Sequence, residues 1–167
     1  MSQSPIPPSS KLANSKVKRL KRVRSLSYIL DNAIPIPGTS HRVGVDPILG
    51  LLPGAGDFLG TAFSAYIVME AAMLGLPRQT LVRMVFNILL DELAGSVPLV
   101  GDWFDFAFKA NSKNMALLEA HMASPQQSQR VDWWFIILLL GVLILFVIAI
   151  TAISIFMLRL LLQAISG

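Results

Sequence analysis

The chain has 167 residues, enough for one domain and an additional segment. Hydrophobic residues make up 54% of it and charged residues 14%, whereas an average soluble domain carries about 25% charged residues, so the composition is that of a membrane protein. The absence of cysteine excludes disulfides, thiol catalysis and cysteine metal ligands. The net charge is +4, and seven of the 14 Lys and Arg lie between Lys11 and Arg24, which indicates an anionic partner for this region.

The N-terminal region divides into a tail and a helix. Residues 1–13 are rich in Pro and Ser and are predicted to be a disordered tail, because they have little apolar surface to bury. Residues 14–31 are predicted to form a basic amphipathic helix. Its apolar stripe consists of Val17, Leu20, Val23, Leu26 and Leu30. Its basic side chains are Lys16, Lys18, Arg19, Lys21, Arg22 and Arg24. We expect this helix to lie on anionic lipid headgroups; in the alternative, the stripe packs on the rest of the protein.

Two copies of one motif follow a predicted loop at residues 32–45. Residues 46–57 read DPILGLLPGAGD, and residues 91–102 read DELAGSVPLVGD. Both follow the pattern D-x-x-x-G-x-x-P-x-x-G-D, with five identities at a constant offset of 45 residues. We interpret the match as an internal duplication within a domain at 46–122.

Each repeat, at about 46–76 and 91–121, is predicted to form a helix, a Gly/Pro break and a capped helix. Helices are expected from Asp57 to about Leu74, from Pro77 to about Ala94 and from Asp102 to about Met122. Gly75 and Pro77 mark the end of the first of these. The predicted fold class is therefore all-α: a duplicated helix-break-helix domain followed by one C-terminal transmembrane helix.

Four aspartates of the repeats form the one chemically suggestive set: Asp46, Asp57, Asp91 and Asp102. Asp46, Asp57 and Asp102 stand where helix N-caps belong, which explains them without a ligand. If instead the repeats pack about a pseudo-two-fold axis, the carboxylates could form a cation or proton site, as paired broken helices do in transporters. No spacing supports a catalytic residue, a metal-ligand set or a cofactor site, so we expect none.

A transmembrane helix is predicted at residues 133–158, after a polar linker at 123–132. No charged residue occurs from Trp133 to Met157, and these 25 residues span about 37 Å as a helix, more than the ~30 Å hydrocarbon core. Trp133 and Trp134 suit one interface, and Arg159 suits the other. Thirteen of the 14 Lys and Arg precede this helix, which predicts a cytoplasmic N-terminal part and a C-terminus across the membrane.

The paired motifs also carry a resemblance. Three features together resemble an uncharacterised family of bacterial membrane-associated proteins, a domain of unknown function: the run from Gly44 through DPILGLLPGAGD, LGLPR near Arg78, and the second P-x-x-G-D followed by DxxxKAN at Asp105 to Asn111. The resemblance covers about residues 28–122 and leaves out the basic N-terminus and the C-terminal helix. It implies domain boundaries and no activity.

We therefore expect a membrane-anchored, non-enzymatic interaction or scaffold protein, in the bacterial inner membrane. Its expected partners are the lipid bilayer, anionic headgroups, and either a second copy of the chain or another membrane protein; nucleic acid is not expected. The alternative is a small oligomeric protein that conducts ions or protons through the paired Asp loops. Conduction would need these aspartates to be desolvated and convergent, whereas a scaffold needs them only as caps.

Overall fold

The computed structural model describes residues 8–35, 37–38, 42–45, 55–95, 108–123 and 130–166. These residues form the helices α1 (Pro8–Asn32), α3 (Ala55–Met73), α4 (Arg78–Gly95), α6 (Ala110–Ala123) and α7 (Trp133–Ser166). One short antiparallel ladder joins β1 (Ile34–Pro35) to β2 (Arg42–Val43). The predicted all-α fold and the long apolar C-terminal helix are confirmed. Most of both motif copies falls outside the described residues, so the duplication stays a prediction.

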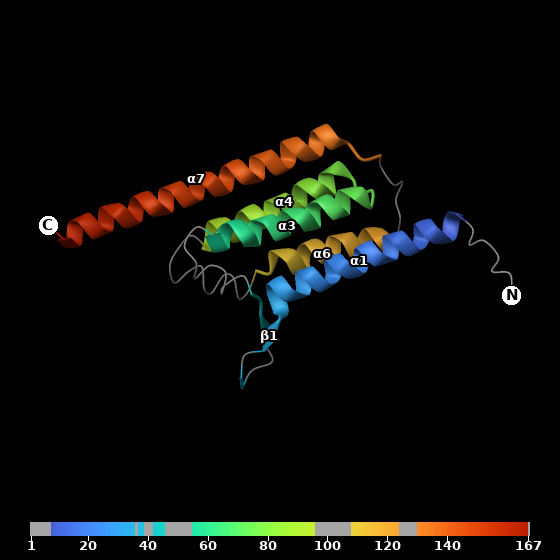
Figure 1. Cartoon of the computed structure of the whole chain (residues 1–167), viewed down its shortest axis with the longest axis horizontal. Coiled ribbons are helices and arrows are strands. Elements are labelled where there is room, and N and C mark those ends of the chain that lie inside the picture. The colour runs from blue at the N-terminus through green and yellow to red at the C-terminus, as the bar shows by residue number, and fades with distance from the viewer. Residues whose placement is uncertain are drawn as a thin grey trace.

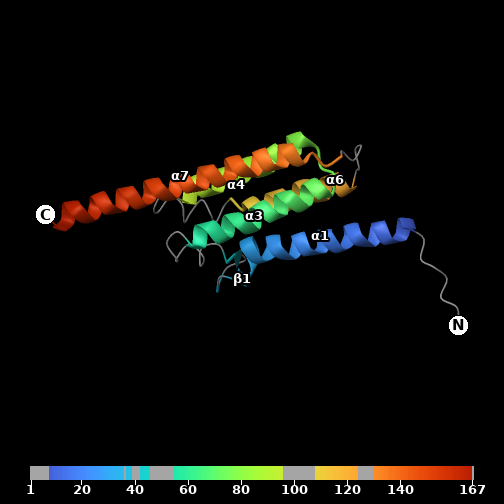
Figure 2. The ribbon, with the colours of Figure 1, turned by 45° about the horizontal axis from the view of Figure 1, so that its top comes forward.

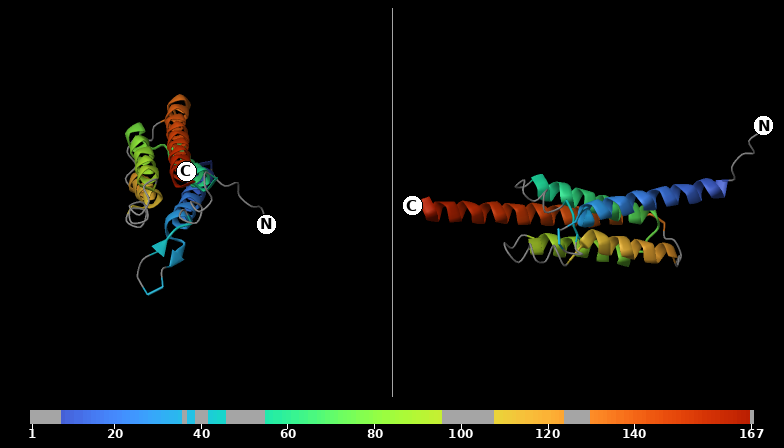
Figure 3. Two further views of the ribbon diagram at one scale, coloured as in Figure 1. Left: turned by 90° about the vertical axis from the view of Figure 1, so that its left-hand side faces the viewer. Right: turned by 90° about the horizontal axis from the view of Figure 1, so that it is seen from below.

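The helices form three layers that share one long axis (Figures 1 and 2). α1 and α6 make one outer layer, α3 and α4 make the middle layer, and α7 lies on the other side of α3 and α4. The end-on view in Figure 3 shows the same order, with α7 and α1 on opposite sides. The first half of α7 runs along the bundle, and its second half projects beyond it (Figure 1).

The core draws on all five helices. Its largest fully buried apolar side chains are Val23, Leu30, Ile67, Val68, Met84, Ile88, Leu118 and Leu143. Val23 and Leu30 belong to the stripe predicted to face lipid, so from Leu20 onward this stripe packs on the rest of the protein, as the alternative supposed. Val17 remains 51% exposed. The burial has a physical reason: packing the stripe on α3 and α6 removes its apolar surface from water.

The turn between α3 and α4 lies where Gly75 and Pro77 predict the end of a helix. Gly75 has a φ of 91°, which a side chain would disfavour. Its N–H donates to the carbonyl of Ala72 at 3.0 Å, and the N–H of Leu76 donates to the carbonyl of Ala71 at 3.3 Å. This pair of bonds is the Schellman arrangement that closes a helix on glycine. The expected end of α3 is therefore confirmed.

Other boundaries differ from expectation. α1 begins at Pro8, so residues 8–13 belong to the helix rather than to a tail; proline suits the first helical turn. The predicted loop at 32–45 contains the β1–β2 ladder. α6 begins at Ala110, after the non-helical residues Phe108 and Lys109, so the prediction of one helix from Asp102 to Met122 is wrong. The cap of α6 comes instead from α1.

Candidate functional site

A cluster of polar side chains joins the end of α1 to the start of α6. We call it the polar junction; its members are Asp31, Asn32, Arg42, Lys109, Asn111 and Ser112. α1 supplies the first two, β2 supplies the arginine, and the start of α6 with the residue before it supplies the rest. Asp31 contacts Asn111 and Ser112, which lie 80 and 81 positions later in the sequence. The fold therefore brings distant segments together at this junction.

Asp31 is the buried centre of the polar junction, with 7% of its surface exposed. Its Oδ2 accepts the backbone N–H of Ser112 at 2.5 Å, and its Oδ1 accepts the side-chain amide of Asn111 at 3.0 Å. Because Ser112 lies in the first turn of α6, Asp31 performs for α6 the task of an N-cap. Burial raises the pKa of Asp31, although the bonds from Asn111 and Ser112 and the charge of Lys109 act in the opposite direction.

Lys109 and Asn32 extend the polar junction to the β-ladder. The Lys109 Nζ donates to Asn32 Oδ1 at 2.5 Å and to the carbonyl of Arg42 at 2.6 Å. Asn32 in turn donates to Ser112 Oγ at 2.9 Å, and the Arg42 Nε donates to the Asn32 carbonyl at 2.9 Å. The ammonium group therefore bridges α1 and β2, and each segment is held by more than one bond.

The polar junction lies close to both motif copies in the sequence and in space. Val45, just before the first motif, donates its N–H to the carbonyl of Ile29 at 3.2 Å. Gly44 passes so close to α1 that a Cβ there would lie 1.2 Å from the carbonyl oxygen of Leu30. The second motif is followed by Lys109 at the polar junction. Both motif copies are thus attached at the same end of the bundle.

A hydrogen bond links Thr61, near the start of α3, to Glu92, near the end of α4. The start of α3 and the end of α4, where the two motif copies adjoin the middle layer, therefore lie side by side.

Of the predicted aspartates, the structure describes two in part. Asp57 belongs to the first turn of α3, which begins at Ala55. Asp91 is half-buried near the end of α4. Asp46 and Asp102 lie outside the described residues. A shared site of these four stays a prediction.

The predicted basic residues divide into two groups. Arg19 and Arg22 lie 2.9 and 3.7 Å from the carboxylate of Glu70, whose side chain is 4% exposed. The Tyr66 hydroxyl also donates to Glu70 at 2.7 Å, and this bond raises the pKa of Tyr66. Arg24 pairs with Glu119 on α6. The lysines of the set are exposed: Lys16, Lys18 and Lys21.

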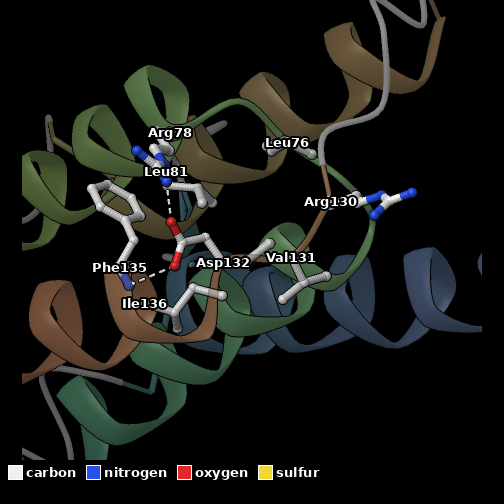
Figure 4. Close-up of a pocket in the computed structure, with 9 residues that line it drawn as sticks. Leu76, Arg78, Leu81, Arg130, Val131, Asp132, Phe135 and Ile136 are labelled. Atoms are coloured by element: carbon white, nitrogen blue, oxygen red, sulfur yellow. Dashed lines mark hydrogen bonds and ion pairs between the residues drawn. The ribbon is translucent and has the colours of Figure 1, made fainter.

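A second joint, drawn in Figure 4, holds α7 to the bundle. Asp132 accepts the N–H of Phe135 at 3.1 Å and so caps α7. Its other carboxylate oxygen forms an ion pair with Arg78, the first residue of α4, whose guanidinium lies 5.2 Å from the Phe135 ring centre. Leu81 and Ile136 line the shallow recess beside this pair. The start of α7 is therefore bound to the start of α4.

These arrangements are suited to holding elements together. Both carboxylate oxygens of Asp31 and of Asp132 accept bonds from the protein itself. Among the residues that the structure describes, no group of three or more His, Asp or Glu could hold a metal ion. The described part of the site works as a pair of clamps: one at the motif loops and one at α7.

Sequence reasoning missed the polar junction. Asp31 and Asn32 are polar residues at the end of an apolar stripe, which indicates only that a helix stops there. The second signal was the DxxxKAN pattern, which contains Lys109 and Asn111. No spacing rule relates these two short segments to each other.

α7 is long and apolar enough to cross a membrane: its stretch Trp133–Ile165 contains an 18-residue window with a mean hydropathy of 3.3, and only 17% of that window is buried. A helix buried in a soluble core would have most of that window covered, so the exposure of α7 favours association with a membrane.

No curated protein and no solved structure matches the chain. A family model described as domain of unknown function DUF4112 matches residues 19–122. The match begins at residue 19 rather than 28, so it includes the part of α1 that packs in the core. It also includes the whole polar junction and ends one residue before the end of α6. The chain therefore belongs to the domain of unknown function family DUF4112.

Proposed function

We propose that this protein is a membrane-anchored, non-enzymatic interaction module in which α7 holds the bundle against the bilayer. The observation that carries this proposal is the way α7 is attached. Ile136, Leu143 and Val147 face the bundle and are 3%, 0% and 5% exposed, while most exposed side chains of α7 are apolar. The Arg78–Asp132 pair fixes its start. The anchor and the domain thus form one unit, and the site supplies clamps rather than reactive groups.

The topology follows from the charges. We propose that residues 134–157 cross a bacterial inner membrane, with residues 1–130 on the cytoplasmic side and the C-terminus on the other. The chain has no cysteine, so a substituted cysteine is the one thiol present. Cysteines at Ser10 and Ser166 should react with an impermeant maleimide from opposite faces of sealed vesicles. Reaction of both from one face would refute this topology.

Anionic headgroups are proposed as partners of the exposed lysines of α1. The N-terminal half of α1 lies at the end of the bundle where α7 begins, because Arg19 contacts Met73 and the α3–α4 turn leads to Arg78. Each cation near an anionic surface contributes about 1 kcal/mol, which salt screens. Trypsin should therefore cut after Lys16, Lys18 and Lys21 more slowly in anionic vesicles than in neutral ones, and added salt should remove the difference. Equal cleavage in both would exclude the contact.

A flux measurement separates this module from an ion- or proton-conducting protein. Vesicles that contain the purified protein should show no proton or cation flux above that of empty vesicles. Asp57→Asn and Asp102→Asn keep a capping side chain and remove the charge, so they should leave the melting temperature unchanged. A flux that both variants abolish at unchanged melting temperature would overturn the proposed function in favour of conduction.

A further inference from the structure

The outward face of α7 is apolar along the whole length of the bundle. Trp134, Leu138 and Leu145 are 84%, 67% and 68% exposed, although they lie beside the buried positions that pack on α3 and α4. Contiguous exposed apolar surface of this kind marks an interaction site. This apolar surface continues onto the neighbouring helices α4 and α3.

On α4 it continues along one stripe. Val82, Phe86 and Leu93 are 47%, 57% and 50% exposed, and with half-buried Leu89 they recur at the spacing that places residues on one helix face. This stripe adjoins α7, because Arg78, one turn before Val82, binds Asp132. The α4 flank beside α7 is therefore apolar.

On α3 a matching stripe runs along the opposite flank. Phe58 is 58% exposed, and Ala62 is exposed at the next turn. Ala65 and Met69 continue the same spacing toward Ala72, which lines the recess at the start of α7. Both flanks of the middle layer thus extend the apolar face of α7.

The charged side chains gather in the other outer layer. α1 and α6 carry Lys18, Lys21, Arg24, Lys113 and Glu119, and α7 does not pack against either helix to a comparable extent. Arg83, an exposed cation of α4, lies four residues before Asn87, whose amide bonds Asn114 of α6, and three residues before Phe86, so it stands at the boundary between the apolar flank and the charged layer. Polarity therefore changes across the bundle, from α7 to α1.

We propose that the flanks of α3 and α4 are immersed in the bilayer hydrocarbon together with α7, so that the bundle is half-embedded and the α1–α6 layer faces water. The inference rests on the proposed anchoring by α7. It follows because α3 and α4 lie alongside the first half of α7, so a crossing that begins near Trp133 places them at membrane depth. Exposed charged side chains are costly at that depth, and the two apolar stripes of α3 and α4 carry none. α7 must consequently cross at a tilt, with the α1–α6 layer tipped toward the cytoplasm.

Paired alanine positions give a matched test in the full chain. Ala62 on the α3 flank and Ala120 on α6 are both exposed on helix surfaces, in different layers. Ala62→Cys and Ala120→Cys are reconstituted into phosphatidylcholine–phosphatidylglycerol vesicles and treated with an impermeant maleimide. An apolar environment raises the pKa of a thiol, and each pKa unit removes about nine-tenths of the reactive thiolate. Ala62→Cys should therefore react at about one-tenth of the rate of Ala120→Cys, or more slowly still. In SDS the two rates should agree.

A lipid-borne quencher identifies what covers the flank. A fluorophore on Ala62→Cys should be quenched by spin-labelled lipid as strongly as one on Ile153→Cys, in the projecting half of α7, and one on Ala120→Cys should not. Protection of Ala62→Cys without quenching would overturn the inference in favour of a second copy of the chain. Quenching at Ile153→Cys with free reaction at Ala62→Cys would refute half-embedding and leave the anchor intact. If Ile153→Cys also escapes quenching, anchoring and half-embedding both fail.

Discussion

Replacing Asp31 tests whether the polar junction holds the bundle closed. Asp31→Ala removes the cap of α6 and leaves the Ser112 N–H and the Asn111 amide without their carboxylate partner. A lost cap costs about 0.5–2 kcal/mol and a buried unsatisfied donor about 1–3 kcal/mol, while relief from burying a carboxylate offsets part of this. We expect a net loss of about 2–4 kcal/mol, or a melting temperature lower by roughly 5–15 °C.

The assay is thermal unfolding of the full chain in mild detergent, followed by circular dichroism. Asp31→Asn is the matched control, because asparagine caps helices as well as aspartate does, and it should stay within about 1 kcal/mol of the wild type. Lys21→Ala, on the exposed face of the same helix, should change stability by less than about 0.5 kcal/mol. An Asp31→Ala variant as stable as the Lys21→Ala variant would refute the role of the polar junction.

The pH dependence of the same comparison follows from the raised pKa of Asp31. In the unfolded chain this carboxyl titrates near 3.8, and in the folded protein it titrates higher, so the folded state holds the proton more tightly. This contribution to stability is present below the unfolded pKa and is lost as pH rises through the folded pKa. The stability of the wild type relative to Asp31→Asn should therefore fall as pH rises from about 4. A relative stability that rises over this range would contradict the assignment.

Two further changes test other contacts. Gly44→Ala should destabilise the protein by about 3 kcal/mol or more, because its Cβ would overlap the Leu30 carbonyl. In the same unfolding assay Gly141→Ala should be neutral or slightly stabilising, because its Cβ meets open space. Glu70→Ala should cost about 1–3 kcal/mol, since it removes the acceptor shared by the Tyr66 hydroxyl and the Arg19 guanidinium, whereas Arg24→Ala, from an exposed pair, should cost less than about 1 kcal/mol; equal losses would contradict the ranking.

The sequence predicted the helix boundaries wherever helix-ending residues lie at the boundary itself. Gly75 and Pro77 end α3 because the backbone geometry they impose needs no distant partner. α7 was predicted because its length and apolar composition act alone. The end of α6 was predicted as well, but its start was not, because the start is capped by Asp31, a residue 81 positions earlier, and no local pattern identifies a cap supplied by another helix.

The stripe of α1 shows a second limit of sequence reasoning. Its apolar residues have the same period whether they face lipid or a neighbouring helix, so Val23 and Leu30 fit both readings equally. Tertiary contact decides between them. The same holds for the candidate site: the sequence supplied Lys109 and Asn111 in a motif, but their association with Asp31 depends on how α1 and α6 pack.

The pairing of Asp31 with Ser112 has a consequence for the order in which the bundle is made. A ribosome adds roughly 5–20 residues per second, so the 81 residues between these partners take roughly 4–16 s to synthesise. During that time the apolar stripe of α1 and its first partner helix, α3, have emerged, and its second partner helix, α6, has not. We expect a chaperone or the membrane surface to cover the remaining apolar surface of α1 during this interval. Once α6 has been synthesised, it packs on α1 and takes over this role.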